Sequence, residues 1–101
     1  MSYNGWSNYE TWNVALWFDN EPGSYEYRRE VSRDHLESAD GDKDTAVSDV
    51  ADWLKDDINV RSPDLGASMY ADLLNAAISE VNWYEIAKHW VEEAVEEAEE
   101  A

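Results

Sequence analysis

The sequence has no cysteine, few basic residues and no long apolar run. The absence of cysteine excludes disulfide bonds, thiolate zinc sites and cysteine nucleophiles. The longest uninterrupted apolar stretch is far shorter than the roughly 20 residues that a helix needs to cross a bilayer. The first ten residues, MSYNGWSNYE, contain neither a basic nor an apolar segment of the kind that makes a signal peptide. These absences predict a soluble, cytoplasmic protein.

Basic residues are outnumbered throughout the chain. Seven Lys and Arg stand against 24 Asp and Glu, which gives a formal net charge of −17 at pH 7. Residues 1–50 hold 11 acids and 4 bases, and residues 51–101 hold 13 acids and 3 bases, so neither half can hide a basic patch. Long-range repulsion disfavours direct binding to nucleic acid or to an anionic membrane, whereas a basic protein partner is favoured.

The apolar residues recur at helical spacing. Hydrophobic residues make up 44% of the 101 residues, and six Trp and six Tyr supply apolar area for one core. The clearest period is Val47, Val50, Ala51, Leu54 and Ile58. Similar spacing predicts helices at residues 9–18, 24–38, 44–58, 63–81 (or from about 68, because Gly66 weakens the first turn) and 83–101. No segment alternates with period two, so the expected fold is all-α, a compact single-domain bundle of about five helices.

Several helix ends carry capping residues. Ser7 and Glu10 have the spacing of a capping box, and Asp44 and Asn82 are expected N-caps. At the other end of the chain, the last glutamates meet the negative end of a helix macrodipole, which disfavours anions. Residues 98–101 are therefore expected to fray as an acidic tail of the single helical domain, residues 1–101.

The aromatic residues are assigned to the core. Trp12, Trp17, Trp53, Trp83 and Trp90 all occur at core spacing. A base-stacking platform is the other use of such rings, but a chain of this charge lacks the basic groove that holds a nucleic-acid backbone.

The segment 24–38 is expected to present the least acidic surface. It holds Arg28, Arg29 and Arg33 among its acids. A role in contacting a protein partner is one interpretation of this Tyr- and Arg-containing helix.

The segment 40–44 has part of a calcium-loop pattern. Asp40, Asp42 and Asp44 are spaced as at the start of such a loop. Thr45 stands where the sharp turn needs Gly, and Ala51 stands where a bidentate Glu belongs. An acidic loop that ends in a helix N-cap is the better interpretation.

The last helix has a second partial metal pattern. Glu85, His89, Glu92 and Glu93 lie at i, i+4, i+7 and i+8. A dinuclear carboxylate site would need a Glu-x-x-His pair on two helices, and His35 is preceded at that spacing by Ser32. No metal site, and no cofactor, is expected.

No catalytic signature can be recognised. The sequence shows no Ser-His-Asp arrangement, no Gly-rich phosphate loop and no pair of buried acids. We expect a protein that is not an enzyme and has no catalytic residues. A small metal-dependent enzyme using Glu85, His89 and Glu92 is the alternative from that class.

The acidity itself has two interpretations. One is halophilic adaptation, in which carboxylates keep a protein soluble at high salt, where screening over about 3 Å at 1 M relieves their repulsion. The other is mimicry of DNA, because carboxylates three or four residues apart on a helix lie about 5–6 Å apart at Cβ and can imitate a row of phosphates. The rows that could bind a partner in this way are Glu85, Glu92, Glu93, Glu96 and Glu97 in the last helix, and Asp49, Asp52, Asp56 and Asp57 in the third.

Two stretches also resemble a known family. NYETWNVALW at residues 8–17, followed by Asn20-Glu21, resembles the opening of a family of small acidic proteins of phages and mobile elements. PDLG at residues 63–66, YADLLNAA at 70–77 and VNWYEIA at 81–87 look like its second block. Together they cover about half of the chain, and residues 38–55 do not follow the resemblance. The matching residues are mainly core positions, so no functional residue carries over.

The resemblance implies a role in evading host defence. Some small acidic proteins of this sort look like anti-CRISPR inhibitors of type I systems, which fill the site where a surveillance complex reads duplex DNA. The leading hypothesis is therefore an acidic DNA-mimic inhibitor in the host cytoplasm that binds a basic nucleic-acid-binding complex. The alternative is a salt-adapted soluble helical domain whose acidity serves solvation and whose partner contacts lie on the second helix.

Overall fold

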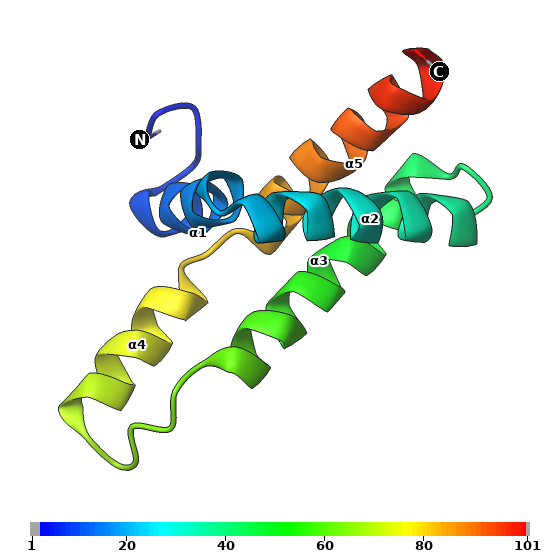
Figure 1. Cartoon of the computed structure of the whole chain (residues 1–101). Coiled ribbons are helices and arrows are strands. Elements are labelled where there is room, and N and C mark those ends of the chain that lie inside the picture. Colours follow the sequence, from blue (N-terminus) through cyan, green and yellow to red (C-terminus); the bar gives the residue numbers. More distant parts are fainter. Residues whose placement is uncertain (1–2, 101) are drawn as a thin grey trace.

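The computed structural model describes residues 3–100 and contains five α-helices (Figure 1). They are α1 (Tyr9–Asn20), α2 (Pro22–Ser38), α3 (Lys43–Arg61), α4 (Met69–Ser79) and α5 (Trp83–Glu100). The described residues also contain an isolated antiparallel bridge between Tyr3 and Trp6 but no strand. The predicted all-α fold of about five helices is confirmed. None of the helices in this range combines the length and apolarity that crossing a membrane requires.

The core lies between α3 and α5, which pack along each other and are covered by α2. Val50 and Leu54 of α3 and Ile86 and Val91 of α5 are completely buried, at 0% exposure. Phe18 of α1 closes one side, with its ring edge-on to Trp90 at a centroid distance of 5.1 Å. The period-3.6 stripe of residues 47–58 therefore does form the core-facing side of α3, as the sequence predicts.

The N-terminus of α1 is tied to the start of α5. Asn8 is the N-cap, and its side chain accepts a hydrogen bond from the Thr11 amide at 2.9 Å. The predicted N-cap, Ser7, is wrong by one residue, because the Ser7 amide and hydroxyl both donate to Glu85 Oε1 instead. Thr11 is fully buried, and its hydroxyl oxygen accepts from the Asn82 amide at 2.8 Å. The bonds from Ser7 to Glu85 and from Asn82 to Thr11 join segments more than 70 residues apart in sequence.

Replacing Thr11 with valine tests this tie. Valine keeps the shape of the side chain but leaves the Asn82 amide without its acceptor, so we expect the free energy of unfolding to fall by about 1 kcal/mol. Thr45→Val is the control, because the Thr45 hydroxyl donates to Asp42 Oδ2 at an exposed position where water can replace it, and stability should change by less than about 0.5 kcal/mol. Urea denaturation measures both variants. Equal effects would contradict a specific role for the buried hydroxyl.

The loops differ from prediction by a few residues. Asp42, rather than Asp44, caps α3, and its carboxylate accepts from the Asp44 and Thr45 amides. Before it, Asp40 and Gly41 have φ of 54° and 82°, and the Gly41 amide donates to Leu36 O at 3.0 Å, so this left-handed pair ends α2. The helix that could begin at Pro63 or near residue 68 begins at Met69, after the N-cap Ser68.

The tryptophans divide between the core and the surface. Trp90 is 3% exposed, and Trp53 and Trp83 pack against the core while partly exposed. Trp12 is half-buried in an aromatic cluster with Tyr3 and Tyr9, at centroid distances of 4.9 and 5.6 Å. Trp17 is 62% exposed, so its assignment to the core is wrong.

Trp17 is exposed because α1 packs on the core through a different face. This helix buries Thr11, Ala15 and Phe18, which are spaced at i, i+4 and i+7, and Trp17 lies outside that stripe. Because α1 is apolar on most of its circumference, its sequence does not indicate which stripe meets the core.

The last helix is continuous as far as Glu100. Of the predicted frayed tail at residues 98–101, Ala101 lies outside the described residues. Fraying of the last turn stays a prediction.

Candidate acidic interface

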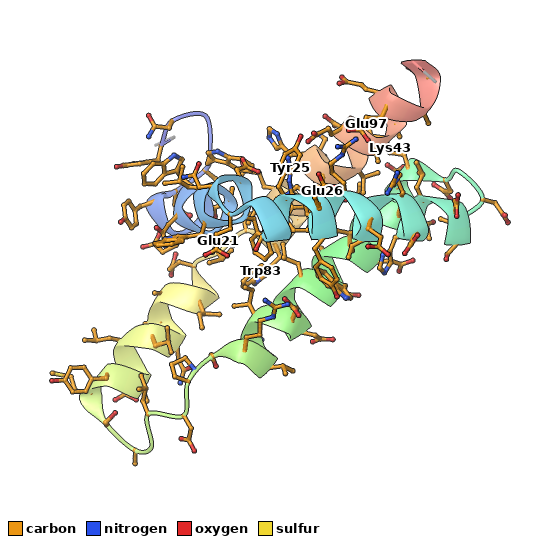
Figure 2. The ribbon with its side chains drawn as sticks, viewed as in Figure 1. Glu21, Tyr25, Glu26, Lys43, Trp83 and Glu97 are labelled. Carbon is orange, nitrogen blue, oxygen red and sulfur yellow. The ribbon has the colours of Figure 1, made fainter. Side chains whose placement is uncertain are left out.

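Three of the five predicted glutamates of α5 form ion pairs with other helices. Glu92 Oε1 lies 3.3 Å from Lys43 Nζ, at the start of α3. Glu93 and Glu97 contact α2, with distances of 3.0 Å to Arg28 Nη2 and 2.9 Å to Arg29 Nη2 respectively. Figure 2 labels Lys43 and Glu97 near the place where α2 passes in front of α5. Each of these carboxylates links α5 to another helix and is partly neutralised.

Arg28 is the centre of this arrangement. Its residue is 7% exposed, although it carries a full charge. Asp19 of α1 lies 3.3 Å from its Nε, and Glu93 of α5 contacts its Nη2, so one cation links three helices. The guanidinium carbon also lies 4.7 Å from the Tyr25 ring centre and 5.7 Å from that of Trp90. Such stacking on aromatic faces suits the weakly hydrated guanidinium.

Arg29 also pairs with a glutamate of α5, but its side chain is more exposed than that of Arg28. The hydrogen bond to Glu97, together with the charge of that carboxylate, raises the pKa of Arg29 above its ordinary value. Because arginine is protonated at any pH at which the protein is handled, the guanidinium keeps its charge across that range.

Glu85 and Glu96 have different surroundings. Glu85 is half-buried and accepts two hydrogen bonds from Ser7, so it fastens the N-terminal segment to α5. Glu96 is exposed, and no ion pair or hydrogen bond of its side chain is found among residues 3–100. Of the α5 row, Glu96 is therefore the one carboxylate that is fully directed to solvent.

The predicted row on α3 is more open. Asp49, Asp52 and Asp56 are all exposed, and within the described part of the chain none of them pairs with a base. They occur at i, i+3 and i+7, which places them on one face. Asp57 differs, because it is half-buried and lies 3.2 Å from Arg61 Nε one turn later.

A second acidic row was missed in the sequence. The exposed side of α2 carries Glu26, Glu30, Asp34 and Glu37. The sequence predicts that residues 24–38 present the least acidic surface, and this is wrong because Arg28 and Arg29 turn inward. The signal that could have found it is the spacing: the four acids follow at i, i+4, i+8 and i+11, whereas both arginines share a face with Ser32.

The two partial metal patterns are dispersed by the fold. His89 stacks on Trp6 at a centroid distance of 4.4 Å, while Glu85 bonds to Ser7 and Glu92 pairs with Lys43. In the loop before α3, Asp42 is occupied as an N-cap. Among residues 3–100 no group of three His, Cys, Asp or Glu side chains is placed to hold a metal ion.

The comparisons with known proteins give one match. Residues 1–100 match a family described as "Family of unknown function (DUF7249)". No curated protein and no solved structure matches the chain.

Proposed function

The chain belongs to a family of unknown function (DUF7249), and we propose that it is a non-enzymatic, acidic DNA-mimic inhibitor. Its partner would be a basic protein or complex that binds duplex DNA. From the resemblance of residues 8–21 and 63–87 to a family of small acidic phage proteins, we propose the DNA-reading site of a type I CRISPR surveillance complex as the target to test first.

The observation that carries this proposal is the exposed aspartate row on α3. On the opposite side of the same helix, Val47, Val50 and Leu54 are at most 1% exposed, which holds α3 in place within the bundle. Asp49, Asp52 and Asp56 therefore have fixed backbone positions, with Cβ separations of about 5–6 Å for neighbours three or four residues apart. Charges that are already in position lose little conformational entropy when they meet a complementary surface.

The arrangement of the bases supports the same proposal. Arg28, Arg29, Lys43 and Arg61 are each paired with a carboxylate of this chain. The remaining three, Arg33, Lys55 and Lys88, are exposed and lie one each on α2, α3 and α5, so no helix presents a row of unpaired bases to a nucleic-acid backbone. A basic partner would meet repulsion from few cations and attraction from many anions.

The interface proposed from the structure differs from the one proposed from sequence. Asp49, Asp52, Asp56 and Glu96 are free to meet a partner, and the exposed acids of α2 add to them. Glu92, Glu93 and Glu97 contribute less, because each of them already pairs with a base. Reversing their charge would weaken the bundle itself and would not test binding.

The test removes the α3 row without touching those ion pairs. The variant Asp49→Asn, Asp52→Asn, Asp56→Asn is compared with the matched control Asp40→Asn, Asp72→Asn, Glu80→Gln, in which three scattered exposed acids are neutralised. Each protein is titrated into a type I surveillance complex bound to a fluorescent target duplex, and displacement is followed by anisotropy. We expect the α3 variant to need about 10- to 100-fold more protein, since each lost contact is worth about 0.5–1 kcal/mol.

Three outcomes are informative. Displacement by the native chain and by the control, with loss in the α3 variant, supports a specific mimic. Equal weakening of both variants would show that net charge acts without a defined face, which contradicts the proposed row. If the native chain displaces duplex DNA from neither this complex nor a panel of other basic DNA-binding proteins, mimicry is wrong.

The salt-adapted domain remains the second candidate, because exposed acids lie on every helix, α4 included. In this interpretation the free energy of unfolding rises with salt as repulsion is screened, and no duplex is displaced. The proposed partner surface on α2 would need revision in that case, since Arg28 is buried and Arg29 is paired.

A further inference from the structure

One end of the molecule has an exposed apolar surface. We call residues 58–79 the arm: the last turn of α3, the connector and α4. Val60, Met69, Tyr70 and Leu73 in the arm are 83%, 65%, 66% and 62% exposed. No residue of α4 is buried, and no other helix packs extensively on it within the described chain. The amphipathic pattern of α4 thus has no matching face in its own bundle.

A groove lies beside the arm. It has a volume of about 430 Å³ and is bordered by α1, by the end of α3 and by α4. Its lining is mainly apolar and includes Val14, Ile58, Pro63, Leu74, Ala77 and Ile78. Figure 1 shows α4 and the end of α3 projecting together away from the other helices. A groove next to a projecting apolar ridge is suited to receive a ridge of the same kind.

The arm also carries much less charge than the rest of the chain. Its 22 residues hold two acids, Asp64 and Asp72, and one base, Arg61, whereas the other 79 residues hold 22 acids and 6 bases. In a chain with a net charge of −17, this nearly neutral segment coincides with the exposed apolar side chains. Solvation of a free surface does not account for it, because there the acids would be expected to continue.

The molecule exposes more surface and is more extended than an average monomer of its mass. The accessible surface is 6631 Å², while a folded monomer of 11.6 kDa is expected to expose about 5,800 Å². The radius of gyration is 14.5 Å against about 13 Å expected for this length. The excess area, about 800 Å², is what one partner contributes to a stable interface of standard size.

We propose that the arm is the interface of a two-fold symmetric dimer, in which α4 of each copy covers the groove of the other. A second copy fits better than a basic partner because the arm offers almost no charge for a basic partner to meet. Figure 1 places the C-terminal end of α5, with its glutamates, at the opposite end of the molecule from α4. Pairing through the arms therefore keeps the two acidic bodies apart, and screening over about 8 Å at physiological salt reduces what repulsion is left.

The experiment measures the mass of the full chain in solution. Sedimentation equilibrium from about 1 to 300 μM in 0.15 and 1 M NaCl should give twice the 11.6 kDa mass, with tighter association at the higher salt. Tyr70→Asp places a charge in the interface and should raise the dissociation constant at least 10-fold. Tyr84→Asp is the matched control, since Tyr84 is a 54% exposed tyrosine on α5 outside the groove, and it should leave the constant unchanged.

Folding of the variants is checked by circular dichroism. Position 70 lies in the first turn of α4, where an acid is favourable, so Tyr70→Asp should preserve the helix. A second variant, Leu73→Asn, gives the same comparison without an added charge. A monomer at every concentration, a mass above two copies, or equal dissociation by Tyr70→Asp and Tyr84→Asp would each overturn the proposal. The first of these would assign the groove to a different protein. None of these outcomes depends on DNA displacement, so this proposal and the proposed function fail separately.

Discussion

Leu54→Ala is expected to lower the free energy of unfolding by about 3–4 kcal/mol, the largest effect of any single change considered for this protein. Leu54 has 0% exposure on α3 and packs in the core cluster with Ile86 and Val91 of α5. Alanine removes the transfer energy of the deleted carbons and leaves a cavity between the two central helices, which cannot close without moving both.

Val60→Ala provides the control for this variant on the same helix. Val60 is 83% exposed, so its shortening should change stability by less than about 0.5 kcal/mol. Urea and thermal denaturation of dilute protein measure both changes, and Leu54→Ala should lower the melting temperature by about 15 °C. A loss below about 1 kcal/mol for Leu54→Ala would contradict a core between α3 and α5.

Arg28→Met is expected to reduce the free energy of unfolding by about 2 kcal/mol. Methionine retains most of the apolar contact with Tyr25 and Trp90, so the loss reports the charge. Without the guanidinium, Asp19 and Glu93 are left as neighbouring anions around a buried position. The figure is lower than for a fully buried pair because the two carboxylate side chains are 49% and 36% exposed and are therefore screened by water.

Arg33→Met is the matched control for the buried arginine. Both residues lie on α2, but Arg33 is exposed and has no carboxylate partner in the described chain, so its loss should be nearly neutral. Urea denaturation at 0.05 and 1 M NaCl should show the difference between the two variants shrinking with salt. The same stability for both would mean that the three-helix link contributes nothing.

The number of helices and most of the core could be predicted from the sequence. The stripe of α3 is regular enough that Val47, Val50 and Leu54 were assigned to one buried face. The cap Asn82 could be recognised because a helical period follows it, and its side chain accepts from the Glu85 amide at 3.0 Å. Helix periodicity and N-caps depend on residues that are close together in the chain, so they can be recognised in a single sequence.

Whether a side chain points to the core or to solvent could not be predicted where it depends on packing between helices. Arg28 is buried because aromatic rings and two carboxylates from α1 and α5 surround its guanidinium. No local sequence pattern predicts these contacts between helices. Trp17 is exposed because α1 has several apolar stripes and uses one. For α4, an amphipathic pattern indicates a face that should be covered but not which molecule covers it.

In the candidate interface, too, the local pattern could be predicted and the contacts between helices could not. That carboxylates would line α3 and α5 could be predicted from their spacing. Which of them pair with bases could not, because Glu92, Glu93 and Glu97 meet partners on other helices. The acidic row of α2 is obscured in the sequence by the arginines between its acids, because their inward direction depends on partners in α5.

The weak attachment of α4 has a consequence for how the chain loses its structure. An 11-residue helix with little tertiary packing is too short to be stable in water by itself. Local opening of residues 69–79 would therefore expose these amides to exchange while the other four helices stay intact. A molecule that covers α4 would shift this local opening equilibrium toward the helix, and part of its binding energy would be used for that ordering.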